Sequence, residues 1–299
     1  MPLSITLVSR NNGVGLSTDM ALLTELFSQA GHRVHRVDWR VPRIAKCDVV
    51  IFLELFNPNL LKFADKSVGI FNPEWFLGQW KPWVAKLSQV WAKSESAVDI
   101  FTPMNPQTVY TGFLSRDLYE PSVQRKTKVL HMQGHSADKN TERVLEAWAT
   151  FPDLPQLTVL SHTTKAVPKG VVRLSRIPEH QLRVVLNEHD IHLCPSRVEG
   201  WGHYISEALS TGAYTITTDM SPMNEHVKPE WGALLTPSKV EPRGFAQACD
   251  VSAKGIASAV RAAAVISHSE RTKMRYAARS HMNRRNADFA TTALKLLEQ

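Results

Sequence analysis

The chain has 299 residues, of which 43% are hydrophobic and 21% are charged, a composition that suits a globular protein of two domains and excludes a disordered one. Its 35 lysines and arginines outnumber its 28 acidic residues, and the resulting net charge of +7 favours anionic partners. No apolar run reaches about 18 residues, which excludes a membrane-spanning helix, and three scattered cysteines favour a reduced, cytoplasmic setting.

The first half of the chain alternates between short apolar runs and helical patterns. Residues 4–9 predict a strand rather than a signal peptide, residues 11–15 predict a glycine-containing turn, and a helix follows that ends at Gly31. Further strands are expected at 33–37, 49–53, 67–71 and 89–92. Strands separated by helices of this length imply βαβ units and a parallel sheet.

The polar stretch 111–128 marks a domain boundary, after which a second strand–loop–helix unit covers 129–150. Further strands are expected at 157–160, 171–174, 191–194 and 214–217, and the tail from Ile256 onwards is expected to be helical. Two Rossmann-like domains facing each other are the predicted architecture. Ligands should then bind between them, at the carboxyl ends of the strands.

The segment 190–219 carries the most chemistry and reads DIHLCPSRVEGWGHYISEALSTGAYTITTD. A buried strand ends at Cys194, a glycine-containing turn covers 199–202, and a helix begins near His203. Glycines let backbone N–H groups approach a ligand closely, and a helix N-terminus favours a diphosphate. Glu199 and Glu207 flank the start of this helix, where they either accept hydrogen bonds from sugar hydroxyls or serve only as a loop charge and a helix charge.

A second segment, 130–148, reads LHMQGHSADKNTERVLEAW and has a similar organisation. A strand, a glycine-containing loop and an amphipathic helix form an arrangement that suits phosphate binding. Lys139 at the helix start would neutralise a diphosphate, and Ser136 would add a hydroxyl donor. The alternative is that Lys139 is one of many surface lysines.

The spacing of Glu199 and Glu207 as E-x7-E, within PSRVEGWGHYISEALSTGAYTITTD, resembles the signature of the retaining GT-B glycosyltransferases of group 1. The resemblance covers roughly 128–227. It implies an α/β fold with two Rossmann-like domains facing a central cleft. Residues 1–120 would form the acceptor domain and residues 121–275 the nucleotide-sugar-binding domain, while a helix over 276–299 would return to the first domain.

The resemblance also implies roles for individual residues. Glu199 would contact the donor sugar, Glu207 would bind ribose, and Lys139 would bind the diphosphate. The turn and the helix start would hold sugar and phosphate through backbone N–H groups; these residues are Gly200, Trp201, Gly202 and His203. The donor base would lie near Arg176 and Ile177. The chain departs from the family at His135, where many members carry an arginine, and this weakens the predicted diphosphate clamp.

The first domain is expected to supply the acceptor side of the reaction. Gly13 and Gly15 follow a strand and resemble the loop where GT-B enzymes bring donor phosphate and acceptor together, although an ordinary tight turn has the same pattern. Glu74 is a candidate contact for the acceptor hydroxyl and a candidate catalytic residue beside Glu199 and Lys139. No Asp-x-Asp motif occurs in the sequence, so we expect no metal and no cofactor besides the nucleotide-sugar substrate, which we expect to be a UDP-sugar.

The acceptor is the least determined part of the prediction. Basic clusters at 33–46 and 116–128, with further arginines in the tail, favour double-stranded DNA carrying a hydroxylated base, as in bacteriophage DNA-modifying glucosyltransferases. A cell-surface glycan or lipid-linked acceptor is a second alternative, against which the helix over 20–29 counts because it is amphipathic but carries no cations, and no stable membrane insertion is expected. A non-catalytic nucleotide-sugar or nucleic-acid binding protein is a third, against which the intact E-x7-E and Lys139 argue.

Overall fold

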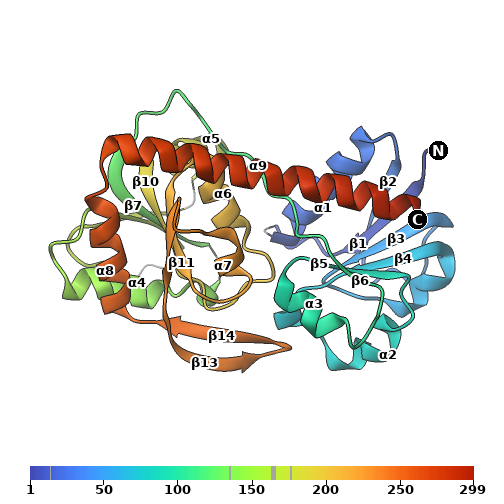
Figure 1. Cartoon of the computed structure of the whole chain (residues 1–299). Coiled ribbons are helices and arrows are strands. Elements are labelled where there is room, and N and C mark those ends of the chain that lie inside the picture. Colours follow the sequence, from blue (N-terminus) through green and yellow to red (C-terminus); the bar gives the residue numbers. More distant parts are fainter. Residues whose placement is uncertain (14, 135, 163–165, 176) are drawn as a thin grey trace. The chain divides into compact units, whose positions relative to one another are not determined.

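The computed structural model describes residues 1–13, 15–134, 136–162, 166–175 and 177–299. They form two compact units (Figure 1). The first unit contains Met1–Ser115, Arg243–Ala246 and Arg285–Gln299, and the second contains Arg116–Pro242 and Gln247–Arg284. Each unit has one six-stranded parallel sheet with helices, so the predicted pair of Rossmann-like domains is confirmed.

The sheet of the first unit has the strand order β2-β1-β3-β4-β5-β6. Its strands are β1 (Ser4–Ser9), β2 (Arg33–Asp38), β3 (Cys47–Leu53), β4 (Ala64–Ile70), β5 (Gln89–Ala92) and β6 (Thr108–Tyr110). Its helices are α1 (Gly15–Gln29), α2 (Lys81–Val84) and α3 (Glu95–Phe101), with short 3-10 turns η1 (Pro58–Phe63), η2 (Pro73–Trp75) and η3 (Gly78–Trp80). After β1 the chain winds first to β2 and then to β3 on the other side, so the topological switch point lies between β1 and β3.

The sheet of the second unit has the order β12-β11-β10-β7-β8-β9. Its strands are β7 (Lys126–Gly134), β8 (Leu157–Ser161), β9 (Val171–Leu174), β10 (His189–Cys194), β11 (Tyr214–Thr218) and β12 (Gly232–Leu235). Its helices are α4 (Thr141–Thr150), α5 (Glu179–Glu188), α6 (His203–Thr211), α7 (Met223–His226) and α8 (Ala253–Ala264), with a 3-10 turn η4 (Ala137–Lys139). The switch point here lies between β7 and β10.

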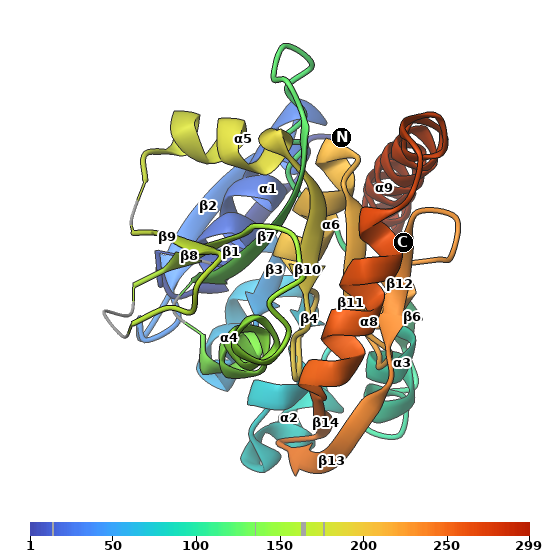
Figure 2. The same ribbon diagram turned by 90° about the vertical axis from the view of Figure 1, so that its left-hand side faces the viewer.

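Helices cover both faces of the second sheet (Figure 2). Val144 and Trp148 of α4 and Val260 of α8 belong to one buried apolar cluster with Val129 and Leu193 of the sheet. Tyr204 and Ile205 of α6 pack with Cys194 and with Met223 of α7 in a separate cluster. Burying both faces leaves the polar residues inside these strands, such as His131, His192 and Thr217, buried as well.

The structure differs from the sequence prediction in a hairpin, in the unpredicted strands β6 and β12, and in the start of the terminal helix. A two-stranded hairpin, β13 (Pro237–Arg243) and β14 (Ala246–Val251), was not predicted, and its turn at Arg243–Ala246 groups with the first unit, where the Phe245 ring lies 5.4 Å from that of Phe76. The terminal helix α9 (His268–Glu298) begins before the predicted 276. Its residues from Arg285 onwards group with the first unit, and there Phe289 packs on Phe113 at 5.0 Å.

No helix in the described ranges is both long enough and apolar enough to cross a membrane.

Candidate active site

The loops that follow β7 and β10 meet at the switch point of the second sheet. The first loop carries Lys139 and the second carries Glu199, and Lys139 Nζ lies 2.5 Å from Glu199 Oε1. Both side chains are mostly buried, with 17% and 15% of their surfaces exposed. Residues sixty positions apart in the sequence are thus brought together where open α/β sheets bind their ligands.

A chain of hydroxyl groups fixes the carboxylate of Glu199. Ser196 Oγ donates to Glu199 Oε1 at 2.5 Å and accepts from the Tyr204 hydroxyl, also at 2.5 Å. Burial raises the pKa of the Tyr204 phenol well above its usual value, so this hydroxyl stays protonated and keeps donating. Lys139 Nζ lies 3.5 Å from the centre of the Tyr204 ring, an additional cation–π contact.

The turn between Glu199 and α6 requires glycine at its last position. Gly202 has φ of +91° and is the N-cap of α6, and a Cβ at this position would lie 3.0 Å from Ile205 Cδ1. Trp201 is buried, and its carbonyl accepts a hydrogen bond from His226 Nε2 at 2.7 Å. Gly200 is also buried, while His203, the first residue of α6, is partly exposed. The start of α6 is thus firmly held beside the Lys139–Glu199 pair.

Glu207, the second glutamate of E-x7-E, has a partner that the sequence did not reveal. Arg116 Nε donates to Glu207 Oε1 at 2.8 Å, and a second guanidinium nitrogen lies 2.7 Å from the same oxygen. Arg116 also pairs with the exposed Glu179 at 3.2 Å. Glu207 is only 6% exposed, so the arginine offsets the cost of burying its charge. In the sequence Arg116 is one member of a basic cluster, and its spacing from Glu207 gives no local signal.

A second ion-pair network braces the two loops against each other. The Arg197 backbone N–H donates to the Asp138 carbonyl at 2.7 Å, and the Arg197 guanidinium pairs with Glu241 at 2.5 Å and Asp250 at 2.6 Å. Asp138 and Arg197 are the neighbours, one and two residues away, of Lys139 and Glu199. Both were missed from the sequence, because the network depends on residues of the unpredicted hairpin.

The remaining predicted donor residues are placed as follows. Ser136 caps η4, its hydroxyl accepting from the Asp138 N–H at 3.1 Å, so part of its hydrogen-bonding capacity is already used. Ile177 is partly buried just before α5. Arg176 and His135 lie outside the described residues.

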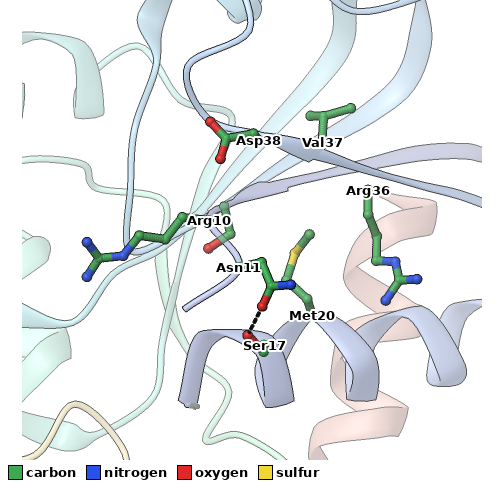
Figure 3. A pocket seen from close by; sticks show the side chains of 8 residues that line it. Arg10, Asn11, Ser17, Met20, Arg36, Val37 and Asp38 are labelled. Atoms are coloured by element: carbon green, nitrogen blue, oxygen red, sulfur yellow. Dashed lines mark hydrogen bonds between the residues drawn. The ribbon is translucent and has the colours of Figure 1, made fainter. Parts of the chain in front are cut away.

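The glycine loop of the first unit borders a pocket of about 320 Å³ (Figure 3). Arg10 and Asn11 from the end of β1, Ser17 from α1, and Arg36 from β2 line it, and Ser17 Oγ donates to Asn11 Oδ1 at 2.6 Å. Gly13 has φ of +69°, and its N–H donates to the Ser17 hydroxyl at 2.8 Å. Gly15 is the first residue of α1. Val14 lies outside the described residues.

Two glutamates follow the central strands of the first sheet. Glu74, in η2 after β4, is 7% exposed, and its carbonyl lies against the Gly244 turn of the hairpin. Glu54 follows β3 at the switch point and is 8% exposed, and burial raises the pKa of its carboxyl. Its backbone has φ of +61°, in the left-handed region that residues other than glycine rarely adopt.

Within the part of the chain that the structure describes, no group of three or more His, Cys, Asp or Glu side chains is arranged to hold a metal ion.

Part of the chain matches a known protein family. Residues 162–279, which include Glu199 and Glu207 but not Lys139, match the family described as glycosyl transferases group 1. No curated protein sequence matches the chain.

Solved structures resemble the whole fold at low sequence identity. A glycosyltransferase from Rickettsia africae ESF-5 has a TM-score of 0.77 at 11% identity, covering 99% of this chain and 98% of that one. The sucrose-phosphate synthase of Thermosynechococcus elongatus has a TM-score of 0.74 at 13% identity, covering 99% and 98%. HepE of Anabaena in complex with UDP and glucose has a TM-score of 0.71 at 13% identity, covering 99% of both chains. The chain therefore has the GT-B fold, and its residues 162–279 match the family of glycosyl transferases group 1.

Proposed function

We propose that this chain is a metal-independent, retaining glycosyltransferase that moves a sugar, a hexose or a pentose, from a UDP-sugar to an acceptor hydroxyl. The observation that carries the proposal is the Lys139–Glu199 pair at the switch point of the second sheet, beside the start of α6. A cation, a helix N-terminus and carboxylates in one place suit a ligand that combines a diphosphate with sugar hydroxyls. HepE, of similar fold, is described in complex with UDP-glucose, so UDP-glucose is the first donor to test.

Each residue that binds the UDP-sugar has one role in this proposal. Glu199 accepts hydrogen bonds from the sugar hydroxyls, and Glu207, oriented by Arg116, accepts from the ribose. Lys139 and the backbone N–H groups of 200–203 stabilise the charge that develops on the leaving diphosphate, which is the role that a metal has in other glycosyltransferases. Ser136 adds a hydroxyl to the phosphate contacts, while Arg176 and Ile177 lie beside the nucleotide base.

The acceptor side is assigned to the first unit, with Gly13 and Gly15 in the loop near the reacting groups and Glu74 as a contact of the acceptor hydroxyl. Arg10 and Arg36 make the pocket beside this loop suitable for an anionic acceptor. Five basic residues on β2 and the loop after it are exposed: Arg33, Arg36, Arg40, Arg43 and Lys46. They support DNA with a 5-hydroxymethylated base, in a bacteriophage setting, as the first acceptor to test.

The second basic cluster lends less support to DNA. Arg116 and Lys126 form ion pairs with glutamates, and Arg125 is half-buried and donates to the Thr211 carbonyl.

The three cysteines are unpaired and buried, which suits a reducing compartment. We place the reaction in the cytoplasm, which would be that of the host if the chain is phage-encoded.

The test is incubation of the protein with UDP-glucose, EDTA and DNA that contains either 5-hydroxymethylated or ordinary bases, followed by mass spectrometry of the digested nucleosides. The proposal predicts a hexose-sized mass gain on the hydroxymethylated nucleoside alone, with the α configuration of the donor retained. Lys139→Met should abolish the gain, whereas Lys254→Met, at an exposed lysine, should not. Release of UDP without modified DNA would redirect the search to glycan or lipid-linked acceptors. UDP binding without release would favour a non-catalytic binding protein.

A further inference from the structure

Glu54 combines two features that reduce stability. Its backbone lies in the left-handed region at φ of +61°, which disfavours residues with a Cβ. Its carboxylate is 8% exposed at the end of a strand whose preceding residues are buried and apolar. A glycine would adopt this backbone conformation without strain, and a small polar residue would avoid the cost of burying a charge. Strained residues of this kind cluster where a ligand needs a side chain in one orientation.

The surroundings of Glu54 hold its carboxylate in place. Asn72, at the end of β4, donates from Nδ2 to Glu54 Oε2 at 2.7 Å, and the Glu54 N–H donates to the Ile70 carbonyl at 2.9 Å. Arg10, at the end of β1, has its guanidinium 3.9 Å from Glu54 Oε1. The charges of Lys93 and Arg10 both favour the ionised carboxylate, and the residues that the structure describes donate no hydrogen bond to Oε1. It remains able to accept a hydrogen bond from a ligand hydroxyl.

The position of Glu54 in the fold points to a ligand. Glu54 and Arg10 follow β3 and β1, the two strands that flank the switch point of the first sheet. Arg10 is 53% exposed on its side chain and lines the pocket beside the glycine loop (Figure 3). Glu54 therefore lies 3.9 Å from the guanidinium of a residue that lines this pocket.

We propose that Glu54 binds the reacting hydroxyl of the acceptor, with Arg10 and Asn72 as positioning residues that orient its carboxylate. The assignment rests on the proposed glycosyl transfer. The hydroxyl donates to Glu54 Oε1, which directs the oxygen lone pairs to the anomeric carbon of the donor. In the transfer step the bond from that carbon to the hydroxyl oxygen forms, the bond to the diphosphate oxygen breaks, and the hydroxyl proton passes to the departing diphosphate.

The test separates acceptor use from donor use and from folding. UDP release without acceptor, transfer to acceptor and the thermal midpoint are measured for wild type, Glu54→Gly, Glu54→Ala and the exposed control Glu25→Ala. We expect Glu54→Gly to unfold at or above the wild-type temperature, because glycine relieves the backbone strain, yet to lose at least tenfold in transfer. UDP release should stay within twofold of wild type in all variants.

Two results would overturn the assignment while leaving the enzyme class intact. One is wild-type transfer by Glu54→Gly. The other is wild-type transfer by Glu54→Ala, which also decides the matter if the glycine variant fails to fold. Absence of both UDP release and transfer in the wild type would instead overturn the proposed function, and the role of Glu54 with it.

Discussion

Gly202 is the residue on which the geometry of the donor turn depends most directly. Its φ is +91°, and a Cβ added there would approach Ile205 Cδ1 to 3.0 Å, which leaves no room for a side chain without a local shift. The same residue is the N-cap of α6, so a shift there moves the backbone N–H groups proposed to bind the diphosphate.

We therefore predict that Gly202→Ala lowers the free energy of unfolding by about 1–2 kcal/mol and weakens UDP binding at least tenfold. Urea unfolding and titration calorimetry measure the two effects. Gly31→Ala is the matched control, because Gly31 has φ of +87° but no atom within 4 Å of the added Cβ. It should lose stability and keep UDP affinity. Equal UDP affinity in Gly202→Ala and wild type would show that the turn does not hold the diphosphate.

How far the candidate site can be predicted from the sequence depends on how many positions separate the interacting residues along the chain. Glu199, Gly202 and Glu207 stand in one segment, where a turn and a helix start are recognisable locally. Arg116 and Arg197 could not be predicted, because each interacts with carboxylates that only the tertiary fold brings near: Arg116 and Glu207 are 91 positions apart. Tyr204 lies within the same segment, but its hydrogen bond to Ser196 depends on how the turn folds back.

At the scale of elements, the central strands and the edge strands β2 and β9 were predictable, whereas the edge strands β6 and β12 and the hairpin were not. The apolar runs of β1, β3, β4, β10 and β11 gave strands close to their observed bounds. β6 has three residues and β13 is mostly polar, so no apolar pattern marks them, whereas β12 (GALL) is apolar but only four residues long. Their formation depends on pairing with a neighbouring strand, which the local sequence does not encode.

Two buried histidines of the central strands in the second unit form hydrogen bonds in their neutral form, His131 to the neighbouring strand and His192 to helix α5. His131 of β7 contacts the Leu193 carbonyl at 2.9 Å and the Thr141 hydroxyl at 2.8 Å, and burial lowers its pKa to about 4. His192 of β10 contacts the Leu186 carbonyl at 2.9 Å, and burial lowers its pKa to about 3. In the unfolded chain both have an ordinary pKa near 6.5.

Because the unfolded state binds protons that the folded state excludes, stability is complete above pH 6.5 and is lost as the pH falls from there towards 4. We predict a loss of about 2 kcal/mol for each histidine between pH 7 and pH 5, measured by urea unfolding at constant ionic strength. His131→Gln should be less stable than wild type at pH 7 but should show a shallower pH dependence. A pH-independent free energy of unfolding in the wild type over this range would contradict this role of the histidines.

At the scale of the whole molecule, the net charge is +7, but only some of the cationic side chains are exposed and able to contact a partner. Arg271 is 6% exposed and donates to carbonyls at the end of α8, and Arg279 pairs with Asp117 and lies 3.8 Å from the Tyr119 ring. These tail arginines, counted from the sequence as part of a DNA surface, are largely occupied within the fold. Among the exposed cations of 33–46, Arg40 is paired with Asp38 at 2.8 Å, so Arg33, Arg36, Arg43 and Lys46 should carry most of any binding to DNA.

We predict that DNA binding, measured by fluorescence anisotropy between about 50 and 300 mM NaCl, weakens linearly with the logarithm of salt concentration. The double variant Arg36→Gln/Arg43→Gln should reduce that slope by about 2, roughly one for each lost phosphate contact. Arg284→Gln, at an exposed arginine of α9, should leave the slope unchanged. An unchanged slope in the double variant would remove the 33–46 segment as a DNA surface.

The central claim is that the second unit binds the nucleotide of a sugar donor through Glu207, and titration of UDP into the protein by calorimetry tests it most directly. We predict that wild type binds UDP and that Glu207→Ala binds it at least tenfold more weakly, since hydrogen bonds from ribose to a charged acceptor contribute about 1.5–3 kcal/mol. Glu179→Ala removes the other, exposed partner of Arg116 and should bind as wild type does. UDP affinity that is the same in Glu207→Ala and wild type, or no UDP binding at all, would contradict the claim.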